Sequence, residues 1–211
     1  MKNPWEKISL SDYENHMQFK DVMQLQAMNE IMYSQINDYN LPVIMILGIA
    51  GGNGLNHIST NPATVKTVYG VDINEQYLSE CKARYPKLHN IFIPLKADLQ
   101  NIETKLPEAN IVIANLLIEY IGLDSFQHII QQTHPEIISC VIQINSSNNF
   151  VSESPYTQAF RNLNDIYHYI TADTLINSLS FSGYQPILQN ETALPGGKIL
   201  IRIDFNYNAE R

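Results

Sequence analysis

The sequence of 211 residues is poor in cysteine, in basic residues and in long hydrophobic runs. Its two cysteines, Cys81 and Cys140, are far apart and lie among apolar residues. This pattern predicts two buried thiols in a reducing compartment, because disulfide frameworks and metal sites need clustered ligands. We therefore expect neither a disulfide nor a metal site.

Positive charge is also scarce. Lys and Arg number 13 against 21 Asp and Glu, so the formal net charge is −8 at pH 7. This balance argues against a broad electrostatic surface for nucleic acid. The amino terminus leads into no apolar signal-peptide core, and no apolar run approaches the roughly 20 residues that span a bilayer. A cytoplasmic protein without a membrane segment or a nucleic-acid partner is the expectation.

The most informative stretch runs from Leu41 to Ile58. It opens with the apolar run Val43 to Leu47, which is typical of a strand buried on both faces of a parallel sheet. Small residues then follow at Gly48, Ala50, Gly51, Gly52 and Gly54. Such residues let a backbone turn tightly and let a ligand approach its N–H groups. A strand, this turn and a helix predict the nucleotide-binding corner of a Rossmann-like unit.

Apolar strands alternate with helical stretches along most of the chain. Strands are predicted over residues 43–47, 65–73, 91–97, 108–117 and 137–144, and helices over 75–85, 125–133 and 172–182. This alternation predicts an α/β fold with a doubly wound, mostly parallel sheet. Two last strands, 184–192 and 199–205, flank a Pro-Gly-Gly turn and predict a closing antiparallel hairpin. The expected sheet has seven strands.

The first 40 residues are predicted to form a helical cap before this core. Residues 8–38 carry apolar side chains at three- and four-residue spacing, with Ser11 or Asp12 as the helix cap. Their apolar face is expected to pack on the sheet or to form a lid over its edge. We predict one domain over 1–211, with the Rossmann-like core at 41–205.

Polar residues end the next predicted strands. Asp72 follows the glycine turn by about 20 residues, the spacing at which an acid accepts hydrogen bonds from ribose hydroxyls. Asp98 ends the third strand and Asn115 lies near the end of the fourth. Because the carboxyl ends of parallel strands meet at one edge, where ligands sit in open α/β sheets, these residues predict a single binding site.

These motifs resemble those of the class I S-adenosylmethionine-dependent methyltransferases, and among them the small-molecule methyltransferase domains of types 11 and 12. The matching segments are Leu-Gly-Ile-Ala-Gly-Gly-Asn-Gly, Val-Tyr-Gly-Val-Asp-Ile, Leu-Lys-Ala-Asp-Leu and Ile-Val-Ile-Ala-Asn-Leu-Leu, within residues 42–205. The resemblance implies S-adenosyl-L-methionine as cofactor and S-adenosyl-L-homocysteine as product. It implies that the methionine part lies against Gly48, Ile49, Ala50, Gly51 and Gly52.

The same resemblance implies which residues contact the ribose and the adenine of the cofactor. Asp72, with Ile73 beside it, would bind the ribose hydroxyls. Asp98 and Leu99 would contact the adenine, and Asn115 would face the methyl-transfer space.

Two positions depart from the family pattern. Ile46 stands where the family usually has an acid, and Ala50 replaces the middle glycine of the turn. We expect Ala50 to keep the turn with a negative φ. Glu14, Tyr13 and His16 are candidates to replace the missing acid.

Methyl transfer to oxygen or nitrogen also needs a base for the proton of the acceptor. Catalytic candidates are His16, Glu119 and Tyr120, the last two in the segment after the fourth strand. A tyrosine face also attracts a sulfonium or a cationic acceptor. Trp5, Tyr13 and Tyr156 are candidates for the apolar wall of a small-molecule acceptor site.

Two other functions remain open. A cofactor-binding module without catalysis, acting through a protein partner, is compatible with Ile46 and with the lack of an unmistakable base. An NAD-dependent oxidoreductase is less favoured, because Gly-x-Gly-x-x-Gly needs glycine where this chain has Ala50 and Asn53.

Overall fold

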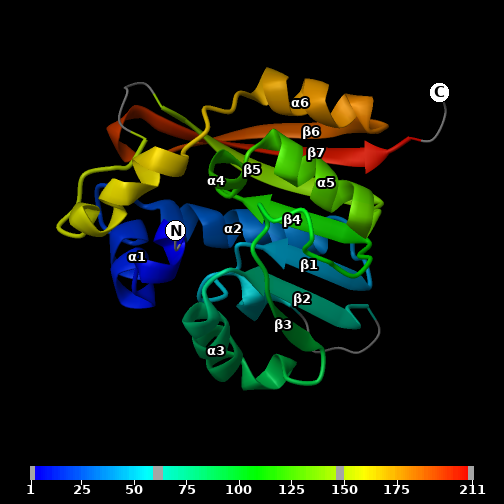
Figure 1. Ribbon diagram of the computed structural model, residues 1–211, viewed down its shortest axis with the longest axis horizontal. Coiled ribbons are helices and arrows are strands. Elements are labelled where there is room, and N and C mark those ends of the chain that lie inside the picture. Colours follow the sequence, from blue (N-terminus) through cyan, green and yellow to red (C-terminus); the bar gives the residue numbers. More distant parts are fainter. Residues whose placement is uncertain (1–2, 59–63, 146–149, 209–211) are drawn as a thin grey trace.

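The computed structural model describes residues 3–58, 64–145 and 150–208, which form a seven-stranded sheet flanked by helices on both faces (Figure 1). The strands are β1 (Val43–Leu47), β2 (Thr67–Asp72), β3 (Phe92–Lys96), β4 (Ile111–Asn115), β5 (Ile137–Asn145), β6 (Tyr184–Ala193) and β7 (Lys198–Tyr207). Their order is β3-β2-β1-β4-β5-β7-β6. β1 to β5 pair in parallel, and β7 runs antiparallel to both β5 and β6. The predicted mostly parallel sheet with a closing antiparallel hairpin is confirmed.

Alternate residues of β1 show how the core is divided between the two faces. Met45 and Leu47 pack with α4 (Ile118–Ile121), α5 (Leu123–Thr133) and α6 (Ala172–Phe181). Ile44 and Ile46 pack on the opposite face, with α2 (Gln24–Asn37) and α3 (Glu75–Arg84). Successive strand side chains point to opposite faces, so an unbroken apolar run is what this two-sided burial requires.

The N-terminal segment is broken where a continuous helix over 8–38 was expected. It consists of η1 (Pro4–Lys7), α1 (Leu10–Met17) and α2, with Met23 in the left-handed region at φ 55° just before α2. The predicted caps at Ser11 and Asp12 are wrong, because the side chain of Ser9 accepts the Asp12 N–H at 3.0 Å and begins α1 there.

This break lets the segment do two things. α2 packs Met28, Met32 and Ile36 toward the sheet, while η1 and α1 lie beyond the carboxyl ends of the strands (Figure 1). The N-terminal segment therefore both packs on the sheet and covers its edge, which are the two positions expected for its apolar face.

Two connections also differ from expectation. The turn of small residues at 48–54, named here the glycine corner, leads into irregular turns and the single 3-10 turn η2 (Leu55–His57) rather than the expected helix. Residues 59–63 lie outside the described residues. After β5, a long 3-10 segment η4 (Thr157–Ile166) follows the polar stretch of which 146–149 are not described. Short 3-10 turns also occur at η3 (Pro86–Leu88) and η5 (Pro195–Gly197).

Helix α6 begins with Thr171 as its cap, whose side chain accepts the Thr174 N–H. No helix in the described part of the chain is long and apolar enough to cross a membrane.

Candidate functional site

The glycine corner leaves β1 and turns back over the carboxyl end of β2. Ala50 lies in the left-handed region at φ 47°, so the prediction that its φ stays negative is wrong. Its N–H donates to the carboxylate of Asp72 at 2.9 Å, and this buried hydrogen bond helps to stabilise a conformation that L-residues rarely adopt.

Gly51 provides a close approach between the corner and α1. A Cβ at this position would lie 2.3 Å from Oε1 of Glu14, so any side chain would displace that carboxylate. Glu14 is in turn ion-paired with Arg84 of α3. Glu14, Ile46 and Gly51 line one small cavity, so Glu14 lies on the side of the corner where the acid is missing from β1.

Gly52 and Ile49 face the protein interior. A Cβ on Gly52 would lie 2.7 Å from Sγ of Cys81, on α3. The side chain of Ile49 is buried with the core of that same face. On the side that faces the protein interior, the corner therefore packs against α3 and β2 through these two positions.

Asp72 ends β2 with both carboxylate oxygens already bonded to the backbone. One accepts the Ala50 N–H and the other accepts the Asn74 N–H, each at 2.9 Å. Burial raises the pKa of Asp72, and these N–H groups act in the opposite direction. Each oxygen has a second lone pair, so the carboxylate keeps acceptor capacity for a ligand.

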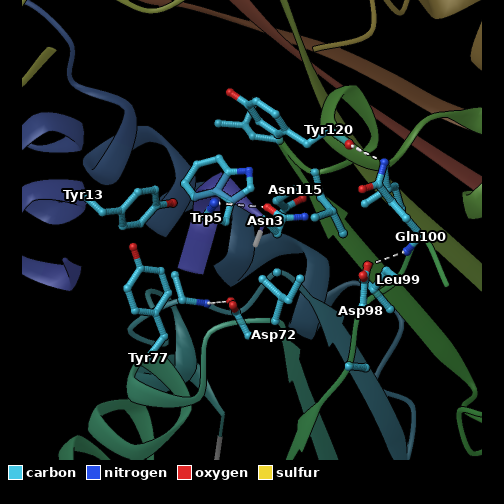
Figure 2. A pocket seen from close by; sticks show the side chains of 17 residues that line it. Asn3, Trp5, Tyr13, Asp72, Tyr77, Asp98, Leu99, Gln100, Asn115 and Tyr120 are labelled. Carbon is cyan, nitrogen blue, oxygen red and sulfur yellow. Dashed lines mark hydrogen bonds between the residues drawn. The ribbon is translucent and has the colours of Figure 1, made fainter. Parts of the chain in front are cut away.

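One cavity collects most of the residues expected to hold a cofactor (Figure 2). Its lining includes Gly48, Ala50, Asp72, Ile73, Asp98, Leu99 and Asn115. We name this cavity the corner pocket. It lies at the carboxyl ends of β1, β2 and β4, which is where open α/β sheets bind their ligands.

The opposite side of the corner pocket is aromatic. Trp5, Tyr13 and Tyr120 line it together with Tyr77 of α3 (Figure 2). Trp5 meets Tyr120 edge to face, with ring centroids 5.0 Å apart. Aromatic rings offer both apolar area and a face that attracts cations, so this wall suits a flat or positively charged ligand.

Side chains that follow β2 donate hydrogen bonds to backbone carbonyls of the N-terminal segment. The hydroxyl of Tyr77 donates to the Ile8 carbonyl at 2.9 Å, and Nδ2 of Asn74 donates to the Trp5 carbonyl at 3.1 Å. Asn74 directly follows the β2 end that carries Asp72. The residues that directly follow β2 therefore hold both the N-terminal segment and the polar side of the corner pocket in place.

Asp98 and Asn115 differ in how free they are to meet a ligand. Asp98 is exposed, and its carboxylate caps the turn by accepting the Gln100 N–H at 3.0 Å. Asn115 exchanges two hydrogen bonds with Gln35 of α2, at 2.9 and 2.8 Å. Gln35 also donates to Ser139, which donates to the buried Asp204. A polar network on the α2 side of the sheet therefore holds Asn115 in place.

A second cavity adjoins the corner pocket and shares Trp5, Tyr13, Leu116 and Tyr120 with it. We name it the inner pocket. Its other lining residues include His16, Gln24, Glu119, Gln143, Phe150, Phe160 and Tyr167. All three catalytic candidates line it, and of these only Tyr120 also lines the corner pocket.

Glu119 is the most unusual side chain of the inner pocket. It is 2% exposed, and its Oε1 accepts the Gln143 N–H at 2.9 Å. Its Oε2 is buried without a hydrogen-bond partner among the described residues. Burial raises the pKa of Glu119 to about 7, against the smaller opposing effect of the Gln143 N–H.

His16 of α1 contacts two residues of the segment after β5. Its Nδ1 lies 2.7 Å from Oγ of Ser154, and its ring lies 4.5 Å from that of Phe160. Burial first, and the nearby charge of Lys198 second, lower the pKa of His16 to about 4. The imidazole is therefore neutral at pH 7.

Several pocket residues were not predicted from the sequence. Tyr77, Gln100, Gln24, Gln143, Phe150, Phe160 and Tyr167 belong to this group. Gln143 had a local signal, as a polar residue near the end of the mostly apolar β5. Phe150, Phe160 and Tyr167 had none, because only the return of this segment over the sheet edge places them here. Tyr156, which was predicted for the wall, packs with this aromatic cluster.

Metal binding has no support in these positions. Within the described ranges, no group of three or more His, Cys, Asp or Glu side chains is placed to hold a metal ion.

No protein-family model and no curated protein matches the sequence. Solved structures, however, match the fold. Magnesium protoporphyrin IX methyltransferase from Synechocystis PCC 6803, solved with S-adenosylhomocysteine, is 12% identical, with a TM-score of 0.68 and 94% of each chain covered. An S-adenosylmethionine-dependent methyltransferase from Mesorhizobium loti is 15% identical, with a TM-score of 0.60, 86% of this chain covered and 99% of that one.

A third similar structure is that of a protein with a different activity. The [4+2]-cyclase SpnF is 8% identical, with a TM-score of 0.62, 86% of this chain covered and 82% of that one. The chain thus has the class I S-adenosylmethionine-dependent methyltransferase fold. Since one fold hosts different chemistries, the function has to be argued from the site.

Proposed function

We propose that this protein binds S-adenosylmethionine in the corner pocket and transfers its methyl group to a small-molecule acceptor in the inner pocket. The observation that carries the proposal is the corner pocket itself, whose lining brings Gly48, Asp72, Asp98 and Asn115 together from four separate strand ends. This is the set that the resemblance to methyltransferases assigned to the cofactor. Similar structures solved with S-adenosylmethionine and S-adenosylhomocysteine support the same assignment.

The residues present fit each part of that cofactor. Asp72 keeps acceptor lone pairs for ribose hydroxyls, and the side of Leu99 offers apolar surface for a base. Gly48 and Ala50 line the corner pocket, so a ligand there can approach the backbone of the turn closely. Glu14 lies against Gly51 in the small cavity that Ile46 also lines, with its carboxylate held by Arg84, and we infer that it is the acid that meets an amino group in place of Ile46.

When bound, S-adenosylmethionine supplies a methyl group that is already activated by its sulfonium. The protein's task is then to orient the acceptor, and orientation alone provides up to about 7–11 kcal/mol in favourable intramolecular reactions. Trp5 and Tyr120 belong to both pockets and so form the boundary across which the acceptor would approach. Glu119 and the neutral His16 are the groups placed to take a proton from it.

The experiment is calorimetric titration with S-adenosylmethionine and S-adenosylhomocysteine, followed by mass spectrometry of methylated products in a small-molecule extract. We expect both compounds to bind, and a product heavier by one methylene unit to accumulate only with S-adenosylmethionine. No binding of either compound at millimolar concentration would sink the proposal.

Two controls separate the other functions. Binding without turnover on broad acceptor panels, together with copurification of a stable partner, would favour a cofactor-binding module. Binding of NAD with a nicotinamide absorbance change, and none of S-adenosylhomocysteine, would favour an oxidoreductase.

A further inference from the structure

The inner pocket contains a buried carboxylate oxygen for which the described chain provides no partner. Oε1 of Glu119 accepts the Gln143 N–H, but Oε2 is left without a donor although the side chain is 2% exposed. Buried polar atoms are nearly always hydrogen-bonded, and leaving one without a partner is unfavourable, above all for a charged group. A carboxylate oxygen of this kind in a cavity wall indicates a missing donor.

The other lining residues of the inner pocket indicate what kind of molecule would supply that donor. Aromatic rings line much of it, from Trp5, Tyr13, Tyr120, Phe150, Phe160 and Tyr167. Phe150 and Tyr167 are stacked with ring centroids 4.1 Å apart, and the rings of Tyr120 and Tyr167 meet edge to face at 6.0 Å. A cavity with aromatic faces and a single carboxylate suits a cation with a flat apolar body.

Gln143 of the inner pocket and Lys198, which contacts the pocket residue Phe150, already form hydrogen bonds within the protein. Gln143 donates through Nε2 to Asn145 and to the Phe150 carbonyl, and its Oε1 accepts from Gln24. The ammonium group of Lys198 donates to the same Phe150 carbonyl. The amide of Gln143 and the ammonium of Lys198 are thus engaged elsewhere, and Oε2 of Glu119 has no donor among the described residues.

We propose that the inner pocket binds a small aromatic amine, whose ammonium group donates to Oε2 of Glu119 while its ring packs among Trp5, Tyr120 and Tyr167. An ammonium has three N–H donors and no acceptor, which matches an acceptor-only carboxylate. Charge-assisted hydrogen bonds are the strong ones, so this contact would decide which ligand class enters. The proposal rests on the proposed function in naming the acceptor class, but amine binding is a property of the inner pocket alone.

The test uses three probes of nearly equal shape and different charge: 2-phenylethylamine, 2-phenylethanol and 3-phenylpropionate. Each is titrated calorimetrically into the full-length protein, with and without saturating S-adenosylhomocysteine. We expect the amine to bind at least about tenfold more tightly than the alcohol, and the carboxylate to bind most weakly. Equal binding of amine and alcohol, tightest binding of the carboxylate, or no binding of any probe at 10 mM overturns the proposal.

Variants then assign the preference to one residue. Glu119→Gln keeps an oxygen for the Gln143 N–H and removes the charge, so the amine should lose about tenfold in affinity while the alcohol changes less than about twofold. Glu75→Gln is the matched control, because it removes the same charge from an exposed residue of α3 paired with Lys96. An unchanged amine preference in Glu119→Gln would also overturn the proposal.

The two levels of the argument fail separately. If S-adenosylhomocysteine does not bind but the amine preference holds, the proposed function is wrong and the amine site stands. If S-adenosylhomocysteine binds and the amine preference is absent, only the amine site is lost. Should Glu119→Gln not fold, the comparison of the three probes on the unmodified chain still decides.

Discussion

The backbone N–H of Ala50 donates to the carboxylate of Asp72 at 2.9 Å, and so the residue that departs from the glycine pattern is bonded to the residue expected to hold the ribose. The bond connects the turn after β1 to the end of β2. Asp72 therefore has a structural role in addition to the binding role proposed for it, and the two can be separated by experiment.

Replacing Asp72 by Ala should lower both stability and cofactor affinity. The change leaves the N–H groups of Ala50 and Asn74 without their acceptor, which costs about 1–3 kcal/mol each when such a group stays buried. Urea unfolding measures the first effect and titration with S-adenosylhomocysteine the second. Asp98→Ala is the control, because Asp98 is exposed and caps one turn: it should weaken binding with a stability loss below about 1 kcal/mol. Unchanged S-adenosylhomocysteine affinity in Asp72→Ala, with an intact fold, would contradict the ribose role.

The left-handed conformation of Ala50 makes this position sensitive to the shape of its side chain. Ala50→Val should destabilise the protein by more than about 2 kcal/mol, since a β-branched residue is strained at positive φ and the site is buried beside Leu10 and Tyr77. Ala50→Gly should stay within about 1 kcal/mol of the parent, because relief of strain and loss of a methyl contact oppose each other. Thermal unfolding of both variants checks this. A Val variant as stable as the parent would show that the turn readily changes its φ.

His16 should make the folded state less stable in acid. Its folded pKa of about 4 lies below the ordinary value of 6.5, so between these pH values the unfolded chain binds the extra proton. Stability from this residue is complete above pH 6.5 and falls by up to about 3 kcal/mol as the pH drops to 4. His16→Asn keeps a polar atom near Ser154 and should remove this slope. The check is the difference between parent and variant unfolding free energies across that range, and a flat difference would refute the assignment.

Glu119 should act in the opposite direction. Its folded pKa of about 7 lies above the ordinary value, so its contribution is complete below pH 4.5 and is lost as the pH rises through 7. Glu119→Gln should therefore match the parent at pH 4.5 and exceed it by up to about 3 kcal/mol at pH 8 in the absence of ligand. Chemical denaturation at the two pH values measures this. A variant less stable than the parent at pH 8 would show that the charged form has an unseen partner.

Gln35 should be necessary for the order of Asn115. It is fully buried on α2 and bonds both Asn115 and Ser139, so Gln35→Met leaves polar atoms of both without this partner at a cost of about 1–3 kcal/mol. Gln26→Met, at an exposed position of the same helix, should change stability by less than about 0.5 kcal/mol. Equal effects of the two substitutions in urea unfolding would show that the network contributes nothing.

Much of the architecture was readable from local patterns. The run from Val43 to Leu47 predicts a central strand because only a strand covered on both faces is apolar at every position. Asp72 and Asp98 could be placed at one edge because parallel strands end on the same side of a sheet. Helix boundaries in the first 40 residues could not be placed, since the cap at Ser9 and the left-handed Met23 depend on how α1 and α2 fit over the sheet and its edge.

Sequence alone determined the sheet, the glycine corner and the acids at the strand ends. The reason is that each is a local pattern: an apolar run of neighbouring residues, or a residue type directly after such a run. Only the tertiary structure decided that Trp5, Glu119 and Gln143 share one wall, since they are brought together from an N-terminal turn, a helix and a strand. Only it showed that Oε2 of Glu119 lacks a partner within the described part of the chain. A hydrogen bond depends on distance and direction between residues far apart in the chain, and no local pattern carries that information.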